Sequence, residues 1–232
     1  MNKRVAIASG VAGLALIGLG AWAYSRERRL LAGTPQRMLG RGRMAQAPIV
    51  SSYNDGQMKT TLRSAPNMPI EQRLATIQDL VHKSVQDPQM RKISLQATAH
   101  CPERDGLCEA KAIYDFIKAR VRYTGDIAPI RHPDGTVDGI DLYQSARRTL
   151  EFGGGDCDDH NILAATMLAQ NGITPKMRVV KTRGAPDWEH IYTIALLPKG
   201  TGNKTVALDT TLPGSTSFGI EPSYHKHIDF DA

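Results

Sequence analysis

The stretch FGGGDCDDH, residues 152–160, joins a glycine turn to the start of an apolar helix. Consecutive glycines let the backbone turn sharply and let another group approach it closely. Asp156 is suited to cap a helix that the apolar spacing predicts over residues 158–170. Cys157 then lies in the first turn, where backbone N–H groups and the helix dipole favour a thiolate. We therefore predict that Cys157 is a nucleophile.

Two acidic neighbours oppose a thiolate at this position, so a basic partner is needed. Asp158 and Asp159 follow the cysteine directly, and their negative charges disfavour a second anion. A protonated histidine is the usual group that offsets such an effect. His190 is the best candidate, because it lies at the start of an apolar segment that is predicted as a strand over residues 189–197.

The histidine in turn needs an acceptor that fixes its orientation. Residues 200–203, GTGN, are typical of a hairpin turn, and the strand predicted over residues 204–209 ends at Asp209. Neighbouring antiparallel strands can bring His190 and Asp209 together. Asp209 would then fix the imidazole tautomer while the other ring nitrogen faces the sulfur. The predicted catalytic set is Cys157, His190 and Asp209.

Each member also has an interpretation without catalysis. A cysteine after glycines is often a small buried residue, and Asp209 followed by threonine is also a turn signal. His160 is nearer to Cys157 in the sequence, but it lies on the same helix and has no obvious partner. We therefore predict that His160 is a polar group on the helix surface or near its cap. The order of the three residues along the chain is a stronger signal than any one of them.

The remaining pattern predicts an α+β fold. Helices are predicted over residues 70–86, 108–122, 142–150 and 158–170, and strands over residues 176–183, 189–197 and 204–209. Helices followed by an antiparallel hairpin are typical of that class. We predict a catalytic domain at residues 68–212 and an irregular C-terminal tail at residues 213–232.

The N-terminus contains a segment that is long and apolar enough to cross a bilayer. Residues 5–24 carry no charge, and Trp22 and Tyr24 lie at one end, where interfacial aromatic residues belong. A helix of this length spans about 30 Å. We predict a transmembrane anchor after a short tail at residues 1–4. The alternative is a signal peptide, because residues 21–23, AWA, resemble a cleavage site.

Basic charge is concentrated before the predicted domain. Residues 1–67 carry ten Lys or Arg and two acidic residues, whereas residues 68–212 carry eighteen of each. A balanced domain lacks the basic stripe of a nucleic-acid binder, so no nucleic acid is expected as a partner. We predict that residues 25–67 are a flexible basic linker, in solvent or on anionic headgroups. The arginines that follow the apolar segment favour a cytoplasmic domain.

Two further cysteines leave three alternatives open. Cys101 and Cys108 can close a small disulfide loop in an oxidising compartment, remain as two reduced thiols, or join His100 in a partial metal site. No second ligand pair accompanies them, so we expect no metal and no cofactor.

Taken together, the motifs resemble the transglutaminase-like superfamily of papain-type cysteine enzymes over about residues 75–212. The matching pieces are VRY at 121–123, GDCDD at 155–159, Gly172-Ile173, HIY at 190–192 and LDTT at 208–211. The resemblance implies a Cys-bearing helix packed on an antiparallel sheet. It gives Cys157, His190 and Asp209 the roles of nucleophile, base and orienting group. The tryptophan that donates to the oxyanion in eukaryotic members has no obvious counterpart, which leaves the backbone N–H of Cys157 or, as a second choice, Gln144.

The resemblance implies acyl transfer through a thioester on Cys157. Water as the acceptor gives a protease or amidase that acts on protein or peptidoglycan peptides, whereas an amine gives a crosslink. We expect a membrane-anchored hydrolase of a bacterial inner membrane or phage virion membrane, or a secreted or periplasmic one if residues 1–23 are cleaved. Its expected partners are a protein or peptide substrate and the bilayer. The alternative is a non-catalytic structural or virion component that retains the fold.

Overall fold

The computed structural model describes residues 49–54, 59–64, 68–125, 130–131, 137–138, 141–197, 204–214 and 217–232. All of them belong to one unit, Gln46–Ala232. The predicted anchor at residues 5–24 lies outside the described residues. Within the part of the chain that is described, no helix is long and apolar enough to span a membrane.

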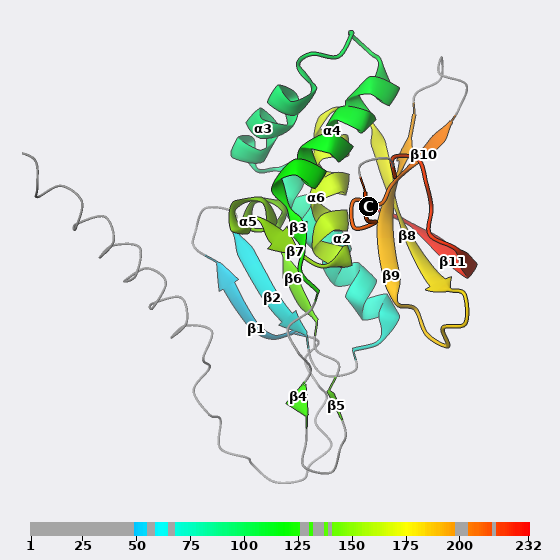
Figure 1. The fold of residues 1–232 in the computed structure, drawn as a ribbon. Helices are drawn as coiled ribbons and strands as arrows, with labels where there is room; N and C mark the ends of the chain where they lie inside the picture. The colour runs from blue at the N-terminus through cyan, green and yellow to red at the C-terminus, as the bar shows by residue number, and fades with distance from the viewer. Residues whose placement is uncertain are drawn as a thin grey trace, which may run out of the picture. The chain divides into compact units, whose positions relative to one another are not determined.

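The centre of the fold is helix α6, Cys157–Gln170, which lies between other helices and the main sheet (Figure 1). Twelve of its fourteen residues are buried. The apolar spacing predicted one inward face, whereas neighbours enclose this helix on all sides. A helix that is apolar around most of its circumference is typical of a central position. This helix positions Cys157 at its first residue.

Four helices surround α6, and one of them was not predicted. They are α2 Ile70–Val85, α3 Pro88–Thr98, α4 Gly106–Arg120 and α5 Ala146–Phe152. Asp87 and Pro88 follow the end of α2, close to the predicted boundary, and they also begin α3. The Asp87 side chain accepts hydrogen bonds from the backbone N–H groups of Gln89 and Met90, and Pro88 occupies the first helical position.

The main sheet covers the other side of α6. Its antiparallel order is β10-β9-β8-β11, with β8 Thr174–Thr182, β9 His190–Leu196, β10 Thr205–Leu208 and β11 Tyr224–Asp231. The first three confirm the predicted strands. Strand β11 differs from the predicted irregular tail. It is an exposed edge strand with little apolar alternation, held by backbone pairing to β8 and by the Arg178 guanidinium, which binds both Asp229 oxygens at 2.7 Å.

Short strands form three small sheets beside the main one. Strands β1, Ile49–Asn54, and β2, Thr60–Ser64, form a three-stranded sheet with β6, Leu142–Gln144. These two strands differ from the flexible linker predicted over residues 25–67, because β1 pairs with β2 and β2 pairs with β6. Four further strands form two short ladders: β3 Arg122–Tyr123 pairs with β7 Gly154–Gly155 in parallel, and β4 Ile130–Arg131 pairs with β5 Val137–Asp138.

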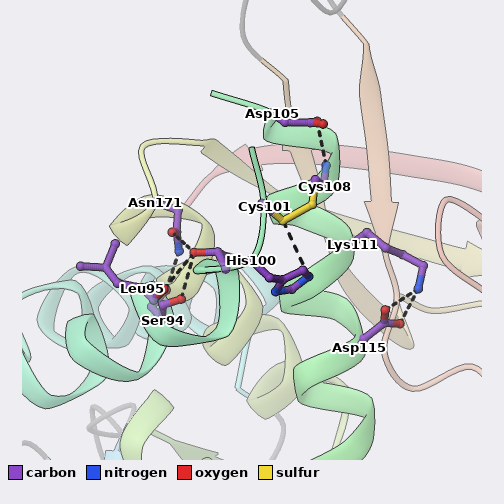
Figure 2. The surroundings of a disulfide bond; sticks show 10 residues. Ser94, Leu95, His100, Cys101, Asp105, Cys108, Lys111, Asp115 and Asn171 are labelled. Atoms are coloured by element: carbon purple, nitrogen blue, oxygen red, sulfur yellow. Dashed lines mark hydrogen bonds and ion pairs between the residues drawn. A yellow bond between two sulfur atoms is a disulfide. The ribbon is translucent and has the colours of Figure 1, made fainter. Parts of the chain in front are cut away.

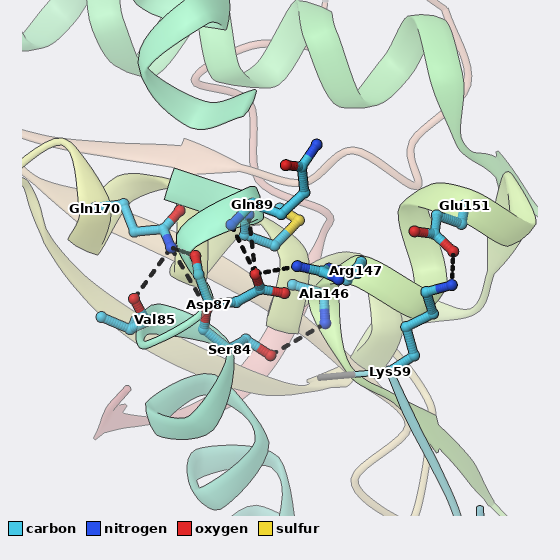
Figure 3. Close-up of polar contacts among 10 residues, drawn as sticks. Lys59, Ser84, Val85, Asp87, Gln89, Ala146, Arg147, Glu151 and Gln170 are labelled. Atoms are coloured by element: carbon cyan, nitrogen blue, oxygen red, sulfur yellow. Dashed lines mark hydrogen bonds and ion pairs between the residues drawn. The ribbon is translucent and has the colours of Figure 1, made fainter. Parts of the chain in front are cut away.

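A buried polar cluster ties α2 to its neighbours (Figure 3). The Asp87 side chain is fully shielded and pairs with Arg147 of α5. The Gln170 amide, at the end of α6, donates to the carbonyls of Ser84, Val85 and Asp87. Removing one partner would leave the other polar group buried and unsatisfied. The cluster therefore fixes where α2 lies against α6.

A disulfide joins the loop that follows α3 to the first turn of α4 (Figure 2). It links Cys101 and Cys108, so of the three alternatives the structure contains the disulfide. Neither sulfur is then available as a thiolate metal ligand. Next to the bridge, the Asp105 side chain caps α4 by accepting from the Cys108 N–H at 3.0 Å.

Candidate active site

The glycine turn places Cys157 at the N-terminus of α6. Asp156 caps the helix, as predicted, and its Oδ1 accepts from the Asp159 N–H at 3.3 Å. Gly155 packs directly against this first turn. A Cβ atom at Gly155 would lie 2.6 Å from the Asp159 Cβ and 2.7 Å from its Oδ2. Residue 155 must therefore be glycine, because a larger side chain would overlap the Asp159 side chain.

His190 and Asp209 lie together, as the strand pairing predicts. His190 begins β9, Asp209 directly follows β10, and these two strands are antiparallel neighbours. The His190 Nε2 and Asp209 Oδ2 atoms are 2.7 Å apart, and the Asp209 side chain is fully shielded from solvent. This hydrogen bond fixes the ring, and it leaves Nδ1 as the ring nitrogen that can address a substrate or thiol.

The turn after β10 holds Asp209 in its ionised form. Its Oδ1 accepts from the Thr211 N–H at 3.1 Å and from the Thr211 hydroxyl at 2.6 Å. Burial alone would raise the pKa of Asp209, but the hydrogen bonds from His190 and Thr211 outweigh it and lower that pKa. Asp209 is thus a charged acceptor for His190 at neutral pH.

Cys157 and His190 line the same cavity, which lies between α2, the N-terminus of α6 and the start of β9. Cys157 is half-buried and outside the disulfide. The structure thus gathers the three predicted residues: His190 contacts Asp209 on one side and shares a cavity with Cys157 on the other. A thiol, an imidazole and a carboxylate in this order can perform nucleophilic acyl transfer.

The two acidic neighbours of Cys157 are buried rather than solvated. Burial, reinforced by the charge of Asp156, raises the pKa of Asp158 and of Asp159. Asp159 also accepts from the backbone N–H of Gln144 at 2.7 Å and from its side-chain amide at 2.6 Å. The same amide donates to the Gly154 carbonyl. Gln144 therefore stabilises the glycine turn. Because its amide N–H groups already donate to Asp159 and Gly154, they do not suit the alternative role of oxyanion donor.

His160 is the residue whose environment the sequence predicted wrongly. It is buried, with 2% of its surface exposed, instead of lying on the helix surface. Its Nδ1 lies 2.7 Å from the Thr210 hydroxyl, and burial lowers the pKa of His160. Neutral His160 therefore stabilises, through Thr210, the turn that contains Asp209. Apolar residues on every side of α6 were the signal that could have predicted this burial.

Potential metal-ligand atoms gather at two places in the described residues. One place is His100 with Cys101 and Cys108, whose sulfurs are already bonded to each other. The other is the buried set Asp156, Asp158 and Asp159, whose ligand atoms lie within 4.8 Å of one another. Buried carboxylates at such spacing are held together by shared protons or by a cation.

Comparison with known proteins gives distant structural neighbours. No curated protein matches the chain. A candidate protease from Parabacteroides distasonis ATCC 8503 is 18% identical, with a TM-score of 0.43 over 58% of this chain and 25% of that one. A candidate cysteine protease from Cytophaga hutchinsonii is 15% identical, with a TM-score of 0.41 over 75% and 63%. A structure named as a TGase is 19% identical, with a TM-score of 0.35 over 69% and 36%.

The chain thus spans between a quarter and two thirds of the length of these neighbours. The sequence itself carries the family assignment. Residues 93–205 match the family model described as the transglutaminase-like superfamily, and this range includes the glycine turn, α6, β8 and β9. This match places residues 93–205 of the chain in the transglutaminase-like superfamily.

Proposed function

We propose that this protein is a cysteine acyl-transfer enzyme. The function that the geometry supports best is hydrolysis of peptide or peptidoglycan-peptide amides through a thioester on Cys157. One observation carries the proposal: His190 is hydrogen-bonded to the buried Asp209 and lines the same cavity as Cys157.

The proposed first half-reaction forms the thioester. The Cys157 thiolate attacks the amide carbonyl, and a tetrahedral oxyanion forms. The backbone N–H of Cys157, at the N-terminus of α6, is the proposed donor to this oxyanion. The His190 imidazolium then donates its proton to the leaving amine, and the C–N bond breaks. Asp209 stabilises that imidazolium and keeps the ring oriented.

The second half-reaction releases the acyl group. Neutral His190 accepts a proton from water, the resulting hydroxide attacks the thioester carbonyl, and the C–S bond breaks. The carboxylic acid leaves, and the thiolate and imidazolium form again. An amine in place of water would give transamidation, and the balance between these acceptors depends on water access to the cavity.

We further propose that the domain acts outside the cytoplasm, held on a membrane by residues 5–24. Disulfides form and persist in oxidising compartments and are rare in the cytosol. The Cys101–Cys108 bridge therefore supports an exported domain and opposes the cytoplasmic placement that the arginines favoured. Removing residues 1–24 should release the protein from membranes. A mature chain that begins near Tyr24 would instead indicate a cleaved signal peptide.

The test of catalysis is selective alkylation of the full chain in detergent without reductant. Iodoacetamide should modify Cys157 rapidly at pH 7, well below the ordinary thiol pKa of about 8.5. Peptide mass spectrometry follows occupancy at each cysteine. His190→Ala should slow the reaction at Cys157, whereas His82→Ala, which changes an exposed histidine at the end of α2, should not.

The opposite result would favour the structural alternative. If Cys157 reacted only as fast as an ordinary thiol, with the same rate in His190→Ala, the pair would not generate a nucleophile. The protein would then be a non-catalytic component that retains the fold.

A further inference from the structure

One face of α2 forms a wall of the cavity that contains Cys157 and His190. Ile70, Leu74 and Ile77 recur at helical spacing and line this cavity together. Leu74 and Ile77 are 5% and 3% exposed, so they form its floor, whereas Ile70 is half-buried at the rim. Val179 of β8 and Ile191 of β9 line the same cavity.

Trp188 supplies another wall, next to the start of β9. Its side chain is half-buried and packs against the hydrophobic core. The ammonium groups of Lys181 and Lys226 lie 5.3 and 5.6 Å from the centre of the indole. Cations at this distance are attracted to an indole face. Two such contacts and the core packing hold the ring in place beside the cavity.

The charged groups that line the cavity are already engaged. The Arg73 Nε lies 2.6 Å from Asp141, and the Glu189 carboxylate accepts from the Thr182 hydroxyl. Asp158 is hydrogen-bonded to Asp156. A charged side chain that enters would lose its water and would have to displace Asp141 from Arg73 or Thr182 from Glu189, which is costly. An aliphatic side chain would gain by leaving water.

We propose that this cavity is the subsite for the acyl donor and that it selects an uncharged aliphatic side chain next to the scissile amide. The inference rests on the proposed function, because it takes Cys157 as the nucleophile. The acyl group is the part of the substrate that stays bonded to Cys157, so it remains longest beside these walls. Helix α2 precedes residues 93–205, which the family model matches, so this wall is a feature of this chain that the family assignment does not supply.

Chloromethyl ketones of single acetylated amino acids test the subsite on the full chain in detergent. The Cys157 thiolate would form a bond to the methylene carbon, and chloride would leave. The probes carry alanine, valine, leucine, glutamate or lysine, and each rate is divided by the rate of the same probe with glutathione. Valine or leucine should exceed alanine, glutamate and lysine by at least about tenfold, since added methylenes in an apolar pocket give about 10- to 200-fold.

Two variants assign the preference to α2. Ile70→Asn places a polar group at the rim and should reduce the leucine-to-alanine ratio by about tenfold. Gln72→Asn creates the same residue in the same turn at an exposed position, and should leave the ratio unchanged. Ile77→Phe fills the floor and should reduce the leucine rate more than the alanine rate. Melting curves check that each variant is folded, and Ile70→Asn alone suffices if the buried change prevents folding.

Iodoacetamide has no amino-acid side chain for the subsite to recognise. It therefore tests the reactivity of Cys157 separately from the preference of the subsite. Loss of its selective reaction at Cys157 would overturn the proposed function itself. Normal iodoacetamide reactivity with equal rates for all five probes would overturn only the subsite. Preference for glutamate or lysine would also overturn it, because Arg73 or Glu189 would then be available to a charged substrate. A leucine preference that persists in Ile70→Asn would place the subsite elsewhere.

Discussion

Replacing Asp209 with asparagine tests the link between the two halves of the proposed site. In the structure, one Asp209 oxygen accepts from His190 and the other accepts twice from Thr211. Asparagine has one oxygen and one NH₂ group, so it cannot accept on both sides. If its oxygen faces His190, its NH₂ group meets the Thr211 N–H. If its NH₂ group faces His190, the ring must place its own proton on Nδ1, towards the side of the thiol.

The magnitude follows from the contact that is lost. A hydrogen bond to a charged group contributes about 1.5–3 kcal/mol. Each 1.36 kcal/mol changes a rate about tenfold, so we expect Asp209→Asn to slow alkylation of Cys157 by about 10- to 150-fold at pH 7. The assay is the second-order rate constant for iodoacetamide, measured by peptide mass spectrometry. Asp187→Asn, an exposed substitution in the loop before β9, should leave that rate constant unchanged.

The same change should be measured in the His190→Ala background. If Asp209 acts through His190, the rate loss from Asp209→Asn should vanish there, because the group that it orients is already gone. An equal loss in both backgrounds would refute the reasoning, since Asp209 would then act only through the stability of the turn.

The pH dependence of stability gives an independent check on the state of Asp209. The pKa of Asp209 is lowered in the folded protein, which means that the ionised carboxylate is more stable in the folded state than in the unfolded chain. That contribution is fully present above the unfolded pKa of about 3.9 and is lost as pH falls through the lower folded value. The difference in Tm between the protein and Asp209→Asn should therefore be largest near neutral pH and shrink as pH falls below about 4.

Three further changes have definite expected outcomes. Gly155→Ala should lower Tm and slow alkylation of Cys157, because its Cβ would lie 2.6 Å from the Asp159 Cβ; overpacking of this kind costs about 1–3 kcal/mol. Asp158→Asn, melted in the presence of a chelator, should raise Tm at pH 7 and change it little at pH 4. The pKa of Asp158 is raised, which means that the folded state disfavours its charged carboxylate. A lower Tm for Asp158→Asn at pH 7 would contradict this. Replacing Cys101 and Cys108 with serine should reduce the free energy of unfolding by about 2 kcal/mol in urea melts, with no change in iodoacetamide reactivity at Cys157.

The sequence predicted the elements whose signals are local. The cap at Asp156, the start of α6 at Cys157 and the three strands β8, β9 and β10 all follow from side chains within a few residues of each boundary. The proximity of His190 and Asp209 also follows, because a short hairpin between two strands leaves few possible pairings.

The elements that the sequence did not predict depend on distant partners. Strand β11 is mostly exposed, and its pairing depends on β8 and on Arg178, more than forty residues earlier. Strand β1 pairs with β2, and β2 pairs with β6, which lies about eighty residues later in the chain. Burial of His160 depends on which elements surround α6; the apolar residues on every side of that helix signal the burial but do not identify these partners. In each case the missing information is tertiary.

The acidic neighbours of Cys157 were the main physical objection to a thiolate, and their burial changes that argument. A carboxylate opposes a nearby thiolate only while it is charged. Burial and the charge of Asp156 raise the pKa of both Asp158 and Asp159, and a charge on Cys157 raises that of Asp158 further. A thiolate at Cys157 therefore disfavours ionisation of Asp158, and a proton on Asp158 removes its repulsion of the thiolate. The proposed reactivity of Cys157 then depends on the helix N-terminus and on His190, so Asp158→Asn should leave its alkylation rate close to that of the unchanged protein.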